Sequence, residues 1–263
     1  GGAEKLTLTI AESLTEHNNV YLILLEEEIN LKIINDKVNI IKLSNTSTYA
    51  KVNKLLNTPL YIYRLLKCIN KYNINKVYSV MERANVINLF TSFFNKSYLP
   101  IISVHATPSI AFKEKPLFVQ HLIRLFYSKV SDRIKVVTVS NGIKNELSDI
   151  YNMKDIKVIY NPINTSQISF LSNENMEDYE FDNAKFNIIT VGRLSQEKGH
   201  IHLINALSKI DDKYKEKINL VIVGDGKELN SLKDEVNRLS LENVSFLGYQ
   251  KNPYKYMKNA DLF

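Results

Sequence analysis

Two cationic side chains, five residues apart, lie in a segment whose pattern could bind a phosphate group. Arg193 and Lys198 belong to the run Gly192-Arg193-Leu194-Ser195-Gln196-Glu197-Lys198-Gly199, which follows an apolar run typical of a strand and precedes a helical pattern. In an α/β sheet, ligands bind where strands end, and the next helix offers unpaired N–H groups to an anion. Because Arg supplies a planar donor fork and Lys a mobile charge, the pair predicts neutralisation of a diphosphate. A solvated loop with two unrelated cations is the alternative.

Two further turns contain glycine and also follow strand-like runs. The first is Val223-Gly224-Asp225-Gly226, where glycine permits a tight turn and Asp225 can cap the next helix. The second is Phe246-Leu247-Gly248-Tyr249, where glycine would let a planar base lie against the backbone. A plain structural turn explains each of them as well, so both interpretations stay open.

Two polar residues in the first half follow other strand-like runs. His105 comes directly after Ser103-Val104, and it is either a loop histidine or a functional one. Glu82, in Val80-Met81-Glu82-Arg83, stands among basic residues. It would either order a substrate or pair with Arg83 or a nearby lysine.

The elements that must position these residues alternate between strand and helix, which predicts an α/β fold with parallel sheets covered by helices. We expect a first domain over residues 1–163, an exposed polar connection over 164–184, and a second domain over 185–263. Strands are predicted at 20–25, 31–34, 39–43, 76–80, 99–104, 135–139, 156–160, 186–191, 218–223 and 244–247, with another beginning at 260–263. Helices are predicted at 3–16, 49–72 with a break at Pro59, 85–94, 117–129, 142–151, 199–210, 227–239 and 254–258.

The charge of the 263-residue chain is +6 and is unevenly distributed. Between Lys42 and Lys144 there are 16 basic residues and three acidic ones. Such a field either keeps a protein soluble or attracts phosphates, anionic lipid headgroups or nucleic acid. Residues 51–71 and 116–129 interleave basic and apolar side chains at helical spacing, which suits a membrane surface as well as a core face. Nucleic-acid binding has charge alone behind it, and we expect none.

Composition and motifs exclude several other classes. One cysteine, Cys68, rules out an internal disulfide, and no apolar run approaches the ~20 residues that span a bilayer. There is no Asp-x-Asp triplet and no metal-ligand spacing, so we expect no metal requirement. The chain lacks an initial Met and begins on Gly1-Gly2, from which we expect a fragment.

Taken together in order and spacing, the segments at 189–199, 220–226, 244–249 and 259–263 closely resemble the donor half of the glycosyl transferases group 1 family. Members of that family are retaining, nucleotide-sugar-dependent enzymes of GT-B architecture. Gly1-Gly2-Ala3-Glu4-Lys5 resembles the family's glycine-rich loop after the first strand, and residues 158–163 resemble its interdomain signature. The resemblance implies two Rossmann-like domains facing a cleft, the second of them truncated.

The resemblance also implies roles for single residues. Arg193 and Lys198 would grip the donor diphosphate and stabilise it as it leaves, which makes them catalytic. His105 would be catalytic through a contact with the transferred sugar, and Glu82 would lie on the acceptor side. The predicted donor-binding set is Gly1, Gly2, Gly192, Arg193, Lys198, Gly224, Gly248 and Tyr249.

The implied reaction moves a hexosyl or N-acetylhexosaminyl group from a nucleotide sugar, a UDP-sugar by expectation, to a saccharide or polyprenyl-linked acceptor in surface polysaccharide or glycan biosynthesis. No cofactor is expected beyond that co-substrate. We expect a cytoplasmic protein with peripheral docking at an anionic membrane face. The family's late acidic pair and terminal helix lie beyond residue 263, so we expect a poorly active fragment. A nucleotide-sugar epimerase and a non-catalytic sugar-nucleotide-binding protein remain the rival hypotheses.

Overall fold

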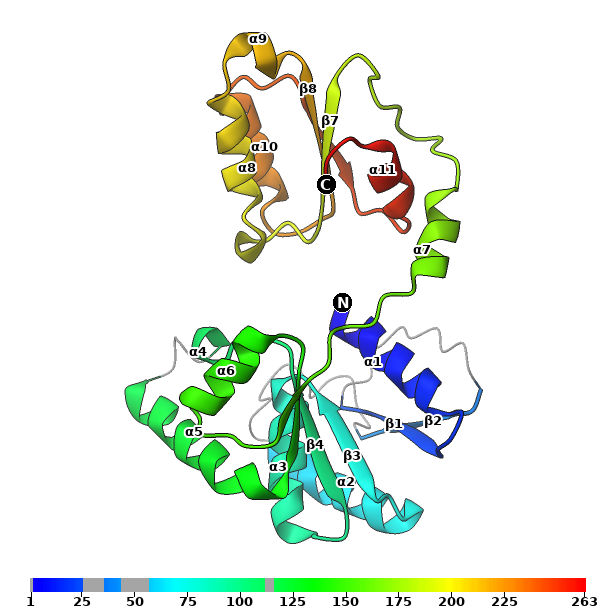
Figure 1. The fold of residues 1–263 in the computed structure, drawn as a ribbon, viewed down its shortest axis with the longest axis vertical. Coiled ribbons are helices and arrows are strands. Elements are labelled where there is room, and N and C mark those ends of the chain that lie inside the picture. The colour runs from blue at the N-terminus through cyan, green and yellow to red at the C-terminus, as the bar shows by residue number, and fades with distance from the viewer. Residues whose placement is uncertain (1, 26–35, 44–56, 112–115) are drawn as a thin grey trace. The chain divides into compact units, whose positions relative to one another are not determined.

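The computed structural model describes residues 2–25, 36–43, 57–111 and 116–263 of the chain. It divides into two compact units, Gly1–Pro162 and Ile163–Phe263. Each unit is built from parallel strands and helices (Figure 1). The strand predicted at 31–34 and the first part of the helix predicted at 49–72 lie outside the described residues.

The first unit contains a four-stranded parallel sheet in the order β3-β4-β5-β6. Val80 lies opposite Ser103, and Val104 lies opposite Thr138, so the carboxyl ends of these strands share one edge. The other two strands, β1 and β2, pair in a separate parallel sheet. The strands are β1 (Val20–Leu24), β2 (Val38–Lys42), β3 (Lys76–Val80), β4 (Leu99–Val104), β5 (Lys135–Thr138) and β6 (Ile156–Val158). The helices are α1 (Gly2–Leu14), α2 (Thr58–Tyr72), α3 (Glu82–Phe94), α4 (Pro108–Ala111), α5 (Leu117–Val130) and α6 (Asn141–Asp149).

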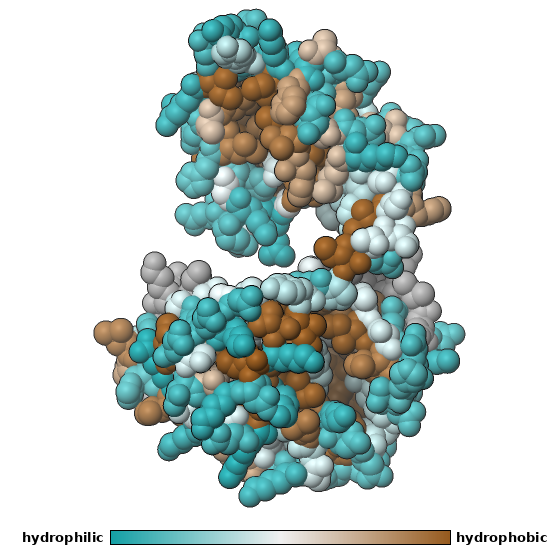
Figure 2. Space-filling view, viewed as in Figure 1, coloured by the Kyte–Doolittle hydropathy of each residue, from teal (hydrophilic) through white to brown (hydrophobic). Residues whose placement is uncertain are grey.

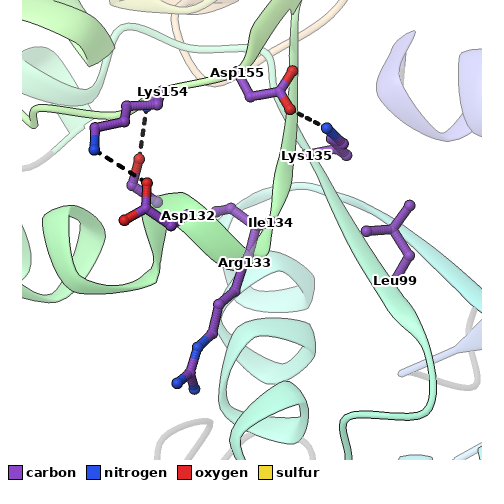
Figure 3. A pocket seen from close by; sticks show the side chains of 8 residues that line it. Leu99, Asp132, Arg133, Ile134, Lys135, Lys154 and Asp155 are labelled. Carbon is purple, nitrogen blue, oxygen red and sulfur yellow. Dashed lines mark hydrogen bonds and ion pairs between the residues drawn. The ribbon is translucent and has the colours of Figure 1, made fainter.

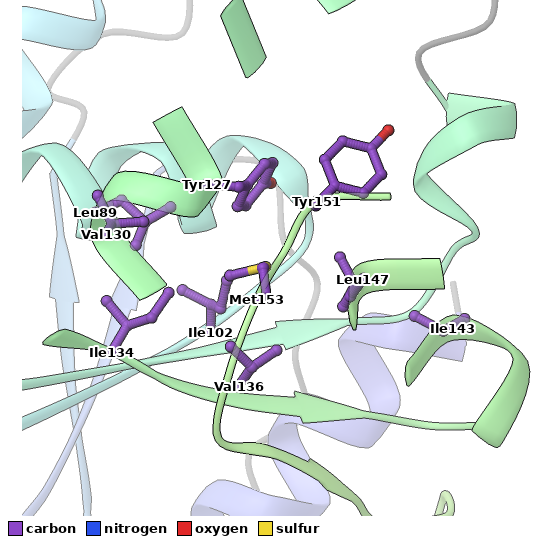
Figure 4. Packing of buried hydrophobic residues seen from close by; sticks show 10 residues of the cluster. All are labelled: Leu89, Ile102, Tyr127, Val130, Ile134, Val136, Ile143, Leu147, Tyr151 and Met153. Atoms are coloured by element: carbon purple, nitrogen blue, oxygen red, sulfur yellow. The ribbon is translucent and has the colours of Figure 1, made fainter. Parts of the chain in front are cut away.

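Apolar side chains from strands and helices fill the core of this unit. Figure 4 shows the cluster in which Ile102 and Val136 from the sheet meet Val130 of α5 and Leu147 of α6. A second cluster joins α2 to α3 through Leu65, Ile69 and Ile87. Burying each such side chain contributes about 1.5–3 kcal/mol, so these clusters hold the strand ends in place.

The predicted break at Pro59 coincides with the start of α2. Pro59 lies in the first turn of that helix, where a missing N–H costs nothing because the first N–H groups have no partner in the helix. The helix ends at Asn73, whose φ of 50° is left-handed.

The second unit has a parallel sheet in the order β7-β8-β9. Alternate residues of β8 face opposite sides: Leu220 and Ile222 pack with α8 and α10, whereas Val221 and Val223 pack with Tyr256 of α11. In Figure 1, α8 and α10 lie on one side of this sheet and α11 lies on the other. Where a strand is predicted to begin at 260–263, the structure has an isolated parallel bridge between Ile188 and Leu262. The elements are β7 (Phe186–Val191), β8 (Ile218–Val223), β9 (Val244–Gly248), α7 (Thr165–Ser172), α8 (His200–Ser208), α9 (Asp212–Lys215), α10 (Leu229–Arg238) and α11 (Tyr254–Asn259).

Most residues over 164–184 are exposed, as the predicted connection requires, but the stretch also contains structure that the prediction omitted. It contains α7, whose N-terminus is capped by Asn164: the Gln167 N–H donates to Asn164 Oδ1 at 2.9 Å. Further along, Phe181 is only 6% exposed and packs on the second sheet. The polar composition of the stretch does not indicate this packing, because only a few separated apolar residues hold the segment against the sheet.

This packing predicts that Phe181→Ala destabilises the second unit by about 3 kcal/mol, the cost of emptying a buried phenylalanine site. Phe170→Ala is the matched control, since Phe170 in α7 is 74% exposed and should change stability by less than about 0.5 kcal/mol. Urea unfolding monitored by circular dichroism measures both. Equal stability of the two variants would mean that the stretch does not pack on the sheet.

Candidate functional site

The segment that carries Arg193 and Lys198 is a loop between β7 and α8. It leaves the sheet at Gly192, forms a single 3-10 turn over Gln196–Lys198, and reverses at Gly199, whose φ of 65° favours glycine. Gly199 then caps α8, which has no side-chain cap and no acidic residue in its first turn. The N-terminus of α8 therefore keeps its partial positive charge.

Backbone hydrogen bonds tie this loop to the turns that follow β8 and β9. The Gly192 N–H donates to the Val223 carbonyl at 2.9 Å, and the Gly224 N–H donates to the Gly248 carbonyl at 2.8 Å. Leu194 donates to the Asp225 carbonyl at 3.0 Å, while its side chain is fully buried among α8 and α10. The three segments that sequence spacing singled out thus form one layer at the carboxyl edge of the sheet.

Two glycines of the turn after β8 are required because the neighbouring backbone leaves no room for a side chain. A Cβ on Gly224 would lie 1.8 Å from the Gly192 carbonyl oxygen, and a Cβ on Gly226 would lie 2.2 Å from the Leu194 carbonyl oxygen. Gly224 also has a φ of 145°. Donor binding by Gly224 stays a prediction beside this structural role. The sequence predicted a glycine turn here but not the close approach of the Leu194 carbonyl that requires Gly226, because an approach of two backbones leaves no pattern in sequence.

The predicted ligand-binding side chains of this layer are accessible. Arg193, Lys198 and Tyr249 are exposed, and neither cation forms an ion pair with any residue that the structure describes. Gly248 has a φ of 66° with nothing within 4 Å of its Cβ position. The second unit therefore brings Gly192, Arg193, Lys198, Gly224, Gly248 and Tyr249 to one edge of one sheet.

In the first unit, the shared edge of β3 and β4 places Glu82 and His105 just beyond paired strand ends. The Ser103 hydroxyl and His105 Nε2 are 2.8 Å apart, and burial lowers the pKa of His105 from its ordinary value. The ring is therefore neutral at pH 7. Glu82 is exposed in the first turn of α3, and the neighbouring Arg83 lies over the ring of Tyr61 at 5.1 Å.

The turn between β3 and α3 is strained and held by a buried amide network that sequence analysis missed. Met81 has φ 77° and ψ 149°, a backbone conformation that is unfavourable for residues other than glycine. Below it, the Ser79 hydroxyl donates to Asn85 Oδ1 at 2.7 Å, and Asn85 Nδ2 donates to the Ser103 carbonyl at 2.9 Å. Asn88 Nδ2 donates to Ser79 Oγ at 3.1 Å. The sequence shows two asparagines three residues apart on one helix face, but their burial becomes evident only in the structure.

Gly1 lies outside the described residues, and Gly2 is the first residue of α1, in open space. The expectation of a glycine-rich loop at this position is therefore not met at Gly2, because its backbone is already helical. Its donor contact, like that of Gly1, stays a prediction.

The hollow drawn in Figure 3 lies at the opposite edge of the first sheet from His105, since Leu99 and Lys135 begin their strands. Its charges are largely paired: Lys135 with Asp155, and Lys154 with Asp132 at 3.1 Å. All four side chains are exposed, so each pair contributes little. This hollow has no part in the candidate site.

Two further features bear on ligands. Within the described ranges, no group of three or more His, Cys, Asp or Glu side chains is arranged to hold a metal ion. None of the helices described is both long and apolar enough to cross a bilayer.

Two α/β units with parallel sheets, the second with a glycine-rich strand edge, form the architecture of the GT-B class of glycosyltransferases. Solved structures show the same fold. A glycosyltransferase from Rickettsia africae matches 100% of this chain and 69% of its own length with a TM-score of 0.72 at 20% identity. Sucrose-phosphate synthase from Thermosynechococcus elongatus matches 99% of this chain and 69% of its own, with a TM-score of 0.75 at 15% identity.

Residues 172–263 match the family model of glycosyl transferases group 1. The resemblance drawn from sequence is confirmed. An N-acetylgalactosamine-N,N'-diacetylbacillosaminyl-diphospho-undecaprenol 4-alpha-N-acetylgalactosaminyltransferase of Campylobacter jejuni is 28% identical over all of this chain and 70% of its own length. An uncharacterized glycosyltransferase of Methanocaldococcus jannaschii is 31% identical over 76% of this chain, which spans about half (52%) of that relative.

The contact between Gly224 and Gly192 predicts that Gly224→Ala destabilises the second unit by about 2–4 kcal/mol, because neither backbone can move without breaking the layer. Gly142→Ala is the control: Gly142 is inside α6, its Cβ would meet only Ser140 Oγ at 3.9 Å, and alanine should stabilise by about 0.5–1 kcal/mol. Thermal unfolding measures both. A neutral Gly224→Ala would contradict the packing described.

Proposed function

We propose that this protein is a retaining glycosyltransferase that transfers a sugar from a nucleotide-sugar donor to a lipid-linked saccharide during glycan biosynthesis. One observation carries the proposal. Arg193 and Lys198 are exposed, form no ion pair among the described residues, and lie on the loop that precedes α8. The backbone of this loop is fixed by the turns after β8 and β9, and α8 has no side-chain cap. The match of residues 172–263 to the glycosyl transferases group 1 family model supports the reaction class.

The chemistry follows from charge. When the bond between the anomeric carbon and the diphosphate breaks, negative charge develops on the departing oxygen, and fixed cations stabilise that charge. Arg193 and Lys198 would do this without a metal ion. The acceptor hydroxyl forms the new bond to the anomeric carbon on the face that the diphosphate leaves, and its proton passes to a diphosphate oxygen. Neutral His105 would hydrogen-bond the transferred sugar.

The acceptor class is proposed from the relatives. Two Campylobacter jejuni relatives, 28% and 24% identical, carry names that describe transfer of N-acetylgalactosamine to diphospho-undecaprenol-linked saccharides. Glu82, exposed at the carboxyl edge of the first sheet, would accept a hydrogen bond from an acceptor hydroxyl.

The donor site is tested by thermal shift with UDP-, GDP- and ADP-sugars. A ligand at 100 times its Kd stabilises a protein by about 2.7 kcal/mol, so we expect one nucleotide class to raise the Tm. Arg193→Ala and Lys198→Ala should each abolish most of that rise because they remove a charge from the diphosphate. Lys209→Ala, an exposed lysine at the other end of α8, is the control and should keep it. A well-folded protein whose Tm no sugar nucleotide raises would refute the transferase proposal.

We also propose that the first unit docks on an anionic membrane surface through α5. Phe118 and Leu125, seven residues apart on one face of the helix, are 67% and 47% exposed. Arg124 lies beside Leu125, and Lys129 lies one turn further on. In Figure 2, apolar side chains reach the surface of this unit on its left side, where α5 begins. An apolar stripe edged by cations is what an interfacial helix presents to lipid.

This docking predicts salt-sensitive sedimentation with phosphatidylglycerol vesicles and little with phosphatidylcholine vesicles. The double variant Phe118→Ser/Leu125→Ser should lose most of the bound fraction, since it removes the inserted apolar side chains. Phe170→Ser, equally exposed but in the second unit, should leave binding unchanged. Binding that does not respond to salt, or no binding at all, would count against α5 as a lipid surface.

A further inference from the structure

The loop between β7 and α8 leaves one buried polar atom without a partner. His200, the first residue of α8, is only 4% exposed, and its Nε2 makes no hydrogen bond to any residue that the structure describes. Buried polar side-chain atoms are nearly always hydrogen-bonded, and an unpaired one lowers stability. The partner of His200 Nε2 therefore lies outside the described residues.

The position of this nitrogen points to where that partner lies. A Cβ built on Gly192 would lie 3.7 Å from His200 Nε2 and 3.9 Å from its Cε1, with no other atom within 4 Å. The imidazole edge of His200 therefore faces the position that a side chain on residue 192 would occupy, and glycine leaves that position vacant. A ligand oxygen that approaches through this position to about 3 Å from Nε2 can accept its hydrogen bond.

The charge around this space favours an anion. The first turn of α8 contains no acidic residue and has no side-chain cap, so its N–H groups face the loop unneutralised. Arg193 follows Gly192 directly, and Lys198 precedes the Gly199 reversal. The cations belong to the loop, whereas the helix terminus and the buried imidazole both belong to the first turn of α8, and each of them suits a phosphate oxygen.

We propose that His200 is a ligand-binding residue of the donor site, with its Nε2–H donating a hydrogen bond to a diphosphate oxygen seated over Gly192. This inference rests on the proposed function, because a nucleoside diphosphate is the anion that it invokes. Arg193 and Lys198 supply charge from flexible, exposed side chains, whereas His200 supplies a fixed direction from within the fold. Gly192 and Gly224 then have different roles. The missing side chain of Gly192 leaves room for the ligand, and that of Gly224 leaves room for the Gly192 carbonyl.

Isothermal titration with UDP, GDP and ADP, and with the matching nucleosides, tests the proposal. For the diphosphate that the wild type binds, His200→Leu and Gly192→Ala should each weaken affinity at least tenfold, because one removes the donor and the other fills the space. Affinity for the nucleoside should stay within about twofold. His200→Gln should remain within about threefold of the wild type, since its amide nitrogen can donate from a similar position. His202→Leu, two residues on and exposed, is the control.

The outcomes separate this inference from the proposed function. If the wild type binds no nucleoside diphosphate, both the proposed function and the role of His200 are refuted. If the wild type binds one and folded His200→Leu binds it equally well, only the role of His200 falls. His200→Leu should melt at or above the wild type, because it removes an unpaired buried nitrogen; a lower Tm that His200→Gln restores would reveal a partner within the protein and overturn the proposal. Should His200→Leu not fold, wild-type affinity in Gly192→Ala overturns it.

Discussion

The close approach of the Gly192 carbonyl to the Cα of Gly224 is the constraint on which the candidate donor site depends. Backbone atoms of two successive strand ends meet where no side chain fits. Because of that approach, Leu194 reaches the Asp225 carbonyl and the Gly224 N–H reaches Gly248. The loop that bears Arg193 is therefore hydrogen-bonded to the neighbouring strand ends, and its backbone is ordered without a ligand.

The first unit fixes its own strand-end turn by a different physical means. There a side chain is present, and Met81 takes an unfavourable backbone conformation. Such strain persists only where the surroundings over-determine it. Ser79, Asn85 and Asn88 provide that through buried hydrogen bonds that join β3, α3 and the carbonyl of Ser103 on β4. These hydrogen bonds fix the backbone at the strand ends that precede Glu82 and His105. The second unit fixes its strand-end turns by close backbone packing at glycine instead.

Sequence predicted most strands because their apolar runs are continuous and bounded by polar residues, and β3, β4, β7 and β8 have the predicted bounds. The loop motif was predictable because charge and glycine spacing are local properties. Asn85 and Asn88 were not, since a polar residue on a helix reveals its burial only once the neighbouring strand is in place. His200 was missed for the same reason: the lack of a partner for Nε2 is a property of everything packed around it.

Leu194 has a consequence for the timing of substrate exchange. Its side chain is buried in the core of the second unit while the residues on both sides of it face outward, so the loop cannot leave the sheet without opening that core. Ordering a residue's backbone costs about 1–2 kcal/mol, and here that ordering belongs to folding. A ligand that binds at this loop would then meet an ordered backbone, while exposed side chains such as Arg193 adjust in picoseconds to nanoseconds.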